Sequence, residues 1–427
     1  MKRLALLLLL PLLLLAAPGA GQARVYLDIT SPEMRKIPVA IPPFIDQAKP
    51  EAIHPSGRDM ANLLGRALVF HGFASLIDPN LYGGRQDANW PSLGAEFVLL
   101  GQYRTEASGI TLELRLLDVN EGRMILGRRY QTPWTGHRQV VLKFCDEVVH
   151  ALTGEMGISR SKIAFSSDKS GDKEIFITDI LGDEITQVTK HKYLAIAPRF
   201  LPDGRRLTYT SYHRGNPNLY LTDFRDLKTT RAISRWPGLN ITPAWAPDGK
   251  SMVLTLSKDG NPDLYQMDDQ GRIMARLTSG EGANVSPNFS PDGRQIAFVS
   301  DRSGSPQIYL MDLKSRAVRR LTFQGNDNTT PAWSPKGDWI AYTGRGDAGL
   351  QIYLIRPEGG APVQLTKTWG EHESPSWAPD GRQLVFSRKR NSREQLCAIF
   401  SNGSGLRVLF ETEAGNQSMP QWSHRLE

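Results

Sequence analysis

The chain has 427 residues, with 51 Lys plus Arg, 44 Asp plus Glu, two Cys, 39 Gly and 28 Pro. This length exceeds one ordinary hydrophobic core, and a composition of 40% hydrophobic and 22% charged residues is that of a globular protein with more than one domain. Basic and acidic residues are interspersed, which argues against a nucleic-acid partner. Two Cys are too few for a zinc cluster or a disulfide framework, and the many Gly and Pro argue against a helical bundle.

The first residues are typical of a secretory signal. Lys2 and Arg3 precede an apolar run over residues 4–17, which is shorter than the roughly 20 residues that span a bilayer. Small residues follow, including Gly21 and Ala23. We therefore expect residues 1–23 to be a signal peptide and the mature chain to be exported, periplasmic and not membrane-embedded. An uncleaved membrane anchor is the alternative.

Residues 24–157 differ in pattern from the rest of the chain. Strand-like runs occupy residues 24–30, 37–41, 97–103, 110–117 and 124–130. Residues 57–71 carry apolar side chains at helical spacing, and residues 136–156 are expected to form a second helix. The pattern predicts a small α/β domain at residues 24–157.

A repeat governs residues 158–427. Its motif is Pro-x-Trp-x-Pro-Asp-Gly, with Phe for Trp in two copies and Lys336 for Asp in one, and its period of 44 or 45 residues is that of a four-stranded propeller blade. Short β-branched and aromatic runs separated by turns fill each repeat and give four strands, here called a, b, c and d. Five copies begin at Pro198, Pro243, Pro287, Pro331 and Pro375, and a sixth start, Pro-Gln-Trp-Ser, begins at Pro420.

The repeats are offset around the ring. The last copy, at Pro420, ends the chain after strand a, whereas residues 163–165, 175–177 and 187–189 match strands b, c and d without a preceding strand a. We therefore expect the C-terminal strand to complete the first blade, which closes the ring and removes exposed sheet edges. The predicted fold is mainly β, a six-bladed propeller preceded by a small α/β domain.

Motifs for catalysis or metal binding are absent from the sequence. There is no His-Glu-x-x-His pair, no Gly-x-Ser-x-Gly elbow and no Gly-x-Gly-x-x-Gly fingerprint. His372 is flanked by Glu371 and Glu373, which we interpret as a solvated loop rather than a metal site. We expect no enzyme activity, no cofactor and no metal.

One face of the propeller is the expected binding surface. The a–b and c–d turns lie on one face, and the b–c and d–a loops lie on the other, where the d–a loops surround the mouth of the channel. The Asp-Gly turns repeat almost unchanged, whereas the d–a loops vary, and variation on a repeated frame can carry specificity. Every b–c loop also carries a basic residue, which suggests a basic rim that docks an acidic or polar partner, although polar loops often contain basic residues. The rim residues are Lys169, Arg214, Lys258, Arg302, Arg345 and Lys389.

These features together resemble the TolB family, periplasmic propeller proteins of the Tol–Pal envelope system. The resemblance spans the whole mature chain: a signal peptide, an α/β domain with Pro43 and Phe44 after its second strand, and six blades. It implies a non-enzymatic adaptor whose propeller mouth binds the lipoprotein Pal and whose mature N-terminus binds TolA. It also implies support of outer-membrane integrity and of constriction during cell division.

The family's contact positions transfer to two segments. Leu239, Thr242 and Ser286 correspond to Pal-contacting positions, and Asn240, Thr330 and Ser374 lie in the same loop or its counterparts. The TolA-contacting segment corresponds to Arg24, Val25, Tyr26, Leu27, Asp28 and Ile29. That segment alternates like a strand, so an ordinary edge strand of the small domain is an equal alternative.

Two other functional classes remain open. A propeller of this kind could be a secreted hydrolase or lactonase, or it could bind carbohydrate. The missing serine elbow counts against the first, and aromatic residues assigned to the core give no support to the second. We expect a monomer with two lone, buried thiols at Cys145 and Cys397, with a bridge between them as the alternative that an oxidising compartment allows.

Overall fold

A computed structural model describes residues 35–410 and 415–426 and confirms the predicted fold class, a six-bladed propeller preceded by an α/β domain. The expected signal peptide and the strand expected at residues 24–30 lie outside the described residues. Within the described ranges, no helix is long and apolar enough to cross a membrane. Both cysteines there are free and buried, which confirms the two lone thiols.

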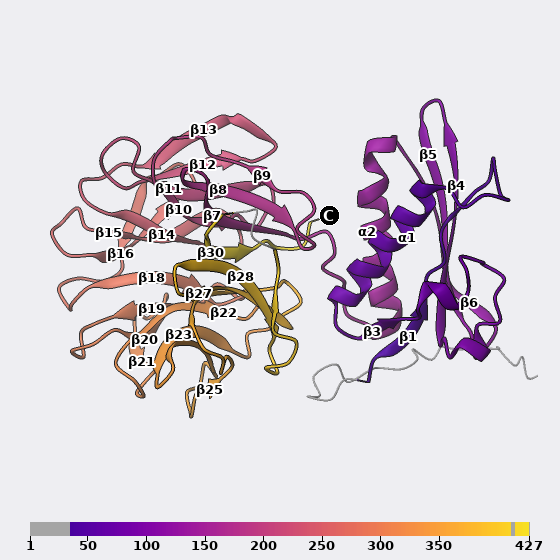
Figure 1. Ribbon diagram of the computed structural model, residues 1–427. Coiled ribbons are helices and arrows are strands. Elements are labelled where there is room, and N and C mark those ends of the chain that lie inside the picture. The colour runs from indigo at the N-terminus through magenta and orange to yellow at the C-terminus, as the bar shows by residue number, and fades with distance from the viewer. Residues whose placement is uncertain (1–34, 411–414, 427) are drawn as a thin grey trace, which may run out of the picture.

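The α/β domain is one mixed sheet with two helices. Its strand order is β3-β1-β4-β5-β6, β2 pairs with β4, and β1 runs parallel to both of its neighbours. Both helices pack on the side of the sheet turned toward the propeller (Figure 1). The elements are β1 (Ile37–Ala40), β2 (Ile45–Asp46), α1 (Pro55–Phe70), β3 (Ala74–Leu76), β4 (Phe97–Glu106), β5 (Gly109–Asp118), β6 (Arg123–Thr132) and α2 (His137–Thr153), with short 3-10 turns at Pro79–Leu81, Pro91–Leu93 and Trp134–Gly136.

Local sequence explains where both helices begin and end. The ring of His54 accepts a hydrogen bond from the backbone N–H of Ser56, 3.3 Å away, and Pro55 opens α1 with its φ already helical. Gly154 ends α2 with a φ of 74°, a conformation that glycine adopts without a Cβ clash. Buried Leu64 on α1 and Val148 on α2 belong to the same hydrophobic core.

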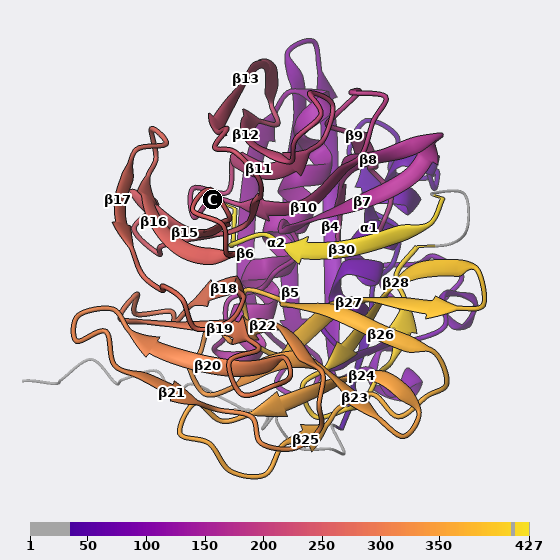
Figure 2. The same cartoon turned by 90° about the vertical axis from the view of Figure 1, so that its left-hand side faces the viewer.

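Six four-stranded antiparallel sheets form the propeller, and Figure 2 shows them arranged around one axis with the α/β domain behind. Strand β30, near the C-terminus, is the innermost strand of the sheet that also contains β7, β8 and β9. Buried residues of neighbouring sheets share hydrophobic clusters, so each blade packs face to face against the next.

The strands of each blade run from the axis outward in the order a, b, c, d. Their bounds are β30 (Gln417–Trp422), β7 (Lys162–Ser170), β8 (Asp172–Asp179), β9 (Thr186–Gln187); β10 (Ala195–Phe200), β11 (Arg206–Ser211), β12 (Asn218–Asp223), β13 (Asp226–Ser234); β14 (Asn240–Trp245), β15 (Ser251–Leu256), β16 (Asp263–Asp268), β17 (Ile273–Arg276); β18 (Asn284–Phe289), β19 (Gln295–Ser300), β20 (Gln307–Asp312), β21 (Val318–Arg320); β22 (Asn328–Trp333), β23 (Ile340–Gly346), β24 (Gly349–Ile355), β25 (Val363–Gln364); β26 (Glu371–Trp377), β27 (Gln383–Arg390), β28 (Arg393–Phe400), β29 (Arg407–Val408).

Candidate functional site

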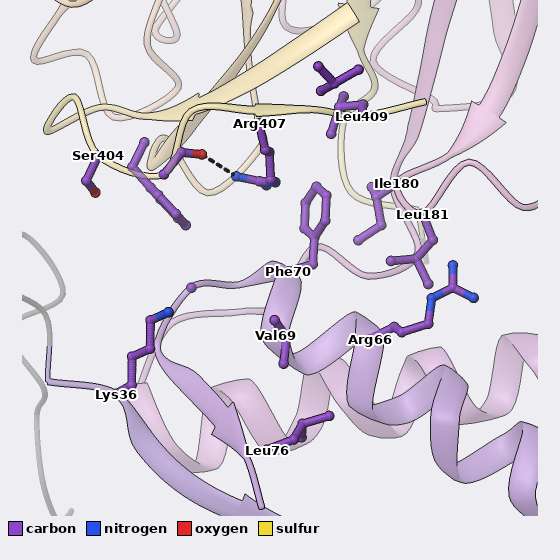
Figure 3. Close-up of a pocket in the computed structure, with 14 residues that line it drawn as sticks. Lys36, Arg66, Val69, Phe70, Leu76, Ile180, Leu181, Ser404, Arg407 and Leu409 are labelled. Carbon is purple, nitrogen blue, oxygen red and sulfur yellow. Dashed lines mark hydrogen bonds between the residues drawn. The ribbon is translucent and has the colours of Figure 1, made fainter. Parts of the chain in front are cut away.

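The two faces of the propeller have different surroundings. The α/β domain contacts the face of the a–b and c–d turns, where Lys336 of an a–b turn lies 3.4 Å from the carboxylate of Glu155. A cavity of about 730 Å³ between the two parts is lined by the end of α1 and by c–d turns of the propeller (Figure 3). The channel mouth therefore lies on the opposite face, away from the α/β domain (Figure 2).

Phe70 at the end of α1 is central to this domain contact (Figure 3). The guanidinium of Arg407 stacks 4.4 Å from the centre of its ring, and the same guanidinium donates to the side chain of Gln383. On the other side of the cavity, Arg66 forms a 2.6 Å ion pair with Asp183. These packed and charged contacts hold the α/β domain against the turn face.

Each innermost strand contains the same backbone irregularity near the mouth. The residue directly before the blade proline has a positive φ of 48–57° although it is not glycine, and the strand register slips there by one residue. Such a bulge turns the strand and re-aims its side chains. Because a left-handed conformation is unfavourable for residues with a Cβ, its repetition in six blades indicates that the ring geometry imposes it. We call these residues the mouth ring: Ala197, Thr242, Ser286, Thr330, Ser374 and Met419.

Four of the residues expected to contact Pal belong to the mouth ring: Thr242, Ser286, Thr330 and Ser374. All four are partly buried rather than fully exposed. The hydroxyl of Thr242 lies 3.1 Å from that of Thr255 on strand b, and Thr330 repeats this contact at 2.7 Å. The structure therefore brings these four residues to equivalent points around one opening.

Two other residues expected to contact Pal lie outside the mouth ring. Leu239 lies in the d–a loop, half-buried, with its N–H donating to the Ser257 hydroxyl at 2.8 Å. Asn240 is fully buried as the first residue of β14, and its amide bonds the carbonyls of Pro217 and Trp236. The expectation that Asn240 faces a partner is therefore wrong, because its side-chain amide is buried and hydrogen-bonded to backbone carbonyls of the surrounding loops.

Buried Asn284 and Asn328 occupy the same strand position and make the same kind of contact. Asn284 donates to a carboxylate oxygen of Asp263 at 3.0 Å, and Asn328 donates to Gln307 at 2.9 Å. Both positions were expected in d–a loops, whereas they begin the innermost strands β18 and β22. The recurrence of asparagine at this position of three repeats is a sequence signal of a structural role.

The expected basic rim lies on the mouth face, but half of its charge is neutralised. Lys258 pairs with Asp259 at 2.7 Å, and Arg345 pairs with Asp327 at 3.2 Å. Arg302 pairs with Glu281 at 2.6 Å. Since these partners are on the same face, the rim is not a continuous ring of free positive charge. Lys169, Arg214 and Lys389 are exposed and form no ion pair within the described residues.

The segment around His372 was interpreted from the sequence as a solvated loop, and that interpretation is wrong, because Glu371, His372 and Glu373 begin strand β26 and His372 is fully buried. Burial raises the pKa of Glu373, and the nearby carboxylates of Glu394 and Glu371 raise it further. His372, between Glu371 and Glu373 in the sequence, is fully buried. Burial lowers its pKa to about 4, so its imidazole is uncharged at neutral pH. Within the described ranges, no three His, Cys, Asp or Glu side chains form a group that could hold a metal ion.

The expected TolA-contacting residues, 24–29, lie outside the described residues, so nothing in this geometry bears on them.

Comparisons with known proteins agree with this architecture. The family model described as the TolB beta propeller domain matches residues 149–426, and the TolB amino-terminal domain matches residues 25–125. The crystal structure of TolB from Acinetobacter baumannii is 27% identical in sequence, with a TM-score of 0.80 over 91% of this chain and 97% of that one.

Curated relatives are similar over a shorter stretch. The Tol-Pal system protein TolB of Desulfotalea psychrophila is 47% identical over 239 residues, which is 55% of each chain. The protein of the same name from Desulfosudis oleivorans is 37% identical over 238 residues, or 53% of each chain. The chain thus spans about half the length of the curated relatives it matches. Because the propeller match alone covers well over half of the chain, this protein belongs to the TolB family.

Proposed function

We propose that this protein is a periplasmic, non-enzymatic adaptor of the Tol–Pal system that binds the lipoprotein Pal at its propeller mouth. The observation that carries the proposal is the mouth ring, whose four hydroxyl-bearing residues Thr242, Ser286, Thr330 and Ser374 lie partly buried at equivalent points around one opening, on the face away from the α/β domain. Family membership supports the choice of system, since the similar proteins carry the name Tol-Pal system protein TolB.

The proposed contact surface combines the mouth ring with loop residues beside it. Leu239 offers a half-buried apolar side chain, while Ser286, Thr330 and Ser374 offer small polar ones. Small side chains around an opening leave room for an inserted partner segment, and the hydroxyls can pair its backbone. Arg214, exposed and unpaired within the described residues, adds a charge that would speed association with an acidic partner.

The second part of the proposal concerns the mature N-terminus. Residues 24–29 bind the C-terminal domain of TolA, so one molecule connects a Pal-binding face to a TolA-binding segment. The connection would support outer-membrane integrity and constriction during cell division. The proposed working state is a monomer.

Binding to the purified soluble domain of Pal tests the first part by calorimetry. Ser286→Arg places a long side chain into the mouth, whereas Gln270→Arg places it on an exposed c–d turn of a neighbouring blade on the opposite face. We expect Ser286→Arg to weaken binding at least about tenfold, the size of effect that a blocked central contact produces, and Gln270→Arg to bind like the unchanged protein. Equal affinity for the two variants would contradict a mouth site.

Deletion of residues 24–29 tests the second part separately. The shortened protein should lose binding to the C-terminal domain of TolA while keeping its affinity for Pal, because the two sites use different parts of the chain. Unchanged TolA binding would remove this segment from the proposal and leave the Pal site standing.

A further inference from the structure

A second cavity lies inside the propeller channel, between the mouth ring and the a–b turns. It has a volume of about 440 Å³, within the range of small-molecule sites, and every blade contributes to its wall. Its lining includes the residue directly after each blade proline, and we call these six the channel ring. The channel ring consists of Arg199, Ala244, Asn288, Ala332, Ser376 and Gln421.

Three members of the channel ring have their acceptor atoms occupied by the backbone of the next blade. The amide oxygen of Asn288 accepts from the N–H of Trp333 at 2.7 Å, and Ser376 accepts from the N–H of Trp422 at 3.0 Å. The amide oxygen of Gln421 accepts from the N–H of Phe200. A backbone N–H can only donate, so it engages the oxygen atom of each of these side chains. The amide NH₂ groups of Asn288 and Gln421 and the hydroxyl hydrogen of Ser376 therefore remain as donors.

Arg199 sits at the equivalent point of its blade and has no acceptor atom at all. One of its nitrogens donates to the carbonyl of Pro198 at 2.8 Å, and no ion pair within the described residues involves it. Burial lowers the pKa of Arg199 to about 10, which still leaves the guanidinium charged at neutral pH. Arg199 is partly buried in the cavity wall, and none of the described cavity-lining residues is a carboxylate that could pair with it, so its charge is available to an anion.

Apart from the imidazole ring of His424, the rest of the cavity wall is apolar or consists of polar groups that are hydrogen-bonded within the protein. None of the described residues that line the cavity is Asp or Glu. The indole N–H groups of all four lining tryptophans donate to protein oxygens, so these side chains offer rings and edges rather than donors. The aromatic residues around the cavity are Phe200, Trp245, Phe289, Trp333, Trp377 and Trp422.

We propose that the channel cavity binds a small organic carboxylate, with the carboxylate paired to Arg199 and the apolar body of the ligand against the aromatic rings. The guanidinium fork matches the two oxygens of a carboxylate, and Gln421, its neighbour in the channel ring, adds a donor beside it. The site is separate from the proposed Pal contacts and does not depend on them.

Titration calorimetry at pH 7.5 with benzoate tests this site, and benzamide serves as the neutral analogue of the same shape. We expect benzoate to bind at least about tenfold more tightly than benzamide, the factor expected for a charge-assisted pair. Quenching of tryptophan fluorescence on binding gives a second readout, because four tryptophans line the cavity.

Three variants complete the test. Arg199→Gln should lower benzoate affinity at least about tenfold, and Arg199→Lys, which keeps the charge without the fork, should lose less. Arg205→Gln removes the same charge from an exposed position of the same blade and should bind like the unchanged protein. The site is overturned by equal binding of benzoate and benzamide, by no benzoate binding to the unchanged protein, or by full affinity in Arg199→Gln.

Discussion

Replacing the alanine of the mouth ring by glycine measures the backbone strain that the propeller imposes there. Ala197 has a φ of 53° directly before its blade proline, whereas Ala244 follows its blade proline and has no positive φ. The two residues are 7% and 6% exposed, so both substitutions remove a similarly buried methyl group. Both also add the same freedom to the unfolded chain.

The difference between the two variants therefore isolates the left-handed conformation. Placing a Cβ in that region costs about 1–2 kcal/mol, which glycine avoids. Ala244→Gly should lose about 1 kcal/mol or more of unfolding free energy, from lost burial and added chain entropy. Ala197→Gly should exceed Ala244→Gly in stability by about 1–2 kcal/mol.

Urea unfolding followed by tryptophan fluorescence gives both free energies of unfolding, since Trp245, Trp377 and Trp422 are buried in the propeller. An equal loss in the two variants, or a larger loss in Ala197→Gly, would refute the reasoning that the bulge holds Ala197 in a strained conformation.

Three further results are expected. Asn284→Ala should lower the free energy of unfolding by about 2–3 kcal/mol, because it leaves buried partners unpaired, while Asn261→Ala, at an exposed amide, should lose under about 1 kcal/mol in the same urea titration. Burial lowers the pKa of His372 from 6.5 to about 4, so the unfolded chain binds more protons between these values, and stability should fall as the pH drops from 6.5 to 4. His372→Gln should flatten that fall in thermal melts across this pH range, and an unchanged slope would contradict it. Cys145 and Cys397 should react with a thiol reagent only after unfolding, because both are buried and burial raises both thiol pKa values; rapid reaction of the native protein would contradict this.

The fold was predictable because the repeat encodes it locally. Each copy carries the same turn and the same strands, so the period of the repeat predicted the number of blades and the four strands of each blade. The offset between Pro420 and the first strands predicted the sheet in which β30 pairs with β7, and the structure contains that sheet. The short strand β3 was missed, since three residues after a helix give too little alternation to recognise.

The candidate site was predictable only in part. Strand order predicted that Thr242, Ser286, Thr330 and Ser374 share one face of the propeller, because connectivity alone decides which loops share a face, and the structure brings them together there. The burial of Asn240 could not be read from its own loop, because its partners include Pro217, 23 residues away. Likewise the charge of Arg302 is matched by Glu281, 21 residues earlier, and only the folded blade brings them together. The position of Arg199 in a cavity wall could not be predicted for the same reason, since the other five blades supply the rest of that wall.

The most direct test of the Pal-binding mouth is hydrogen exchange of the whole protein with and without the soluble domain of Pal. We expect slower exchange in the four segments that carry the proposed Pal-contacting members of the mouth ring, at residues 239–242, 284–286, 328–330 and 372–374, with the a–b turns unchanged. Protection confined to the a–b and c–d turns or to the α/β domain, with no change around the mouth, would contradict it.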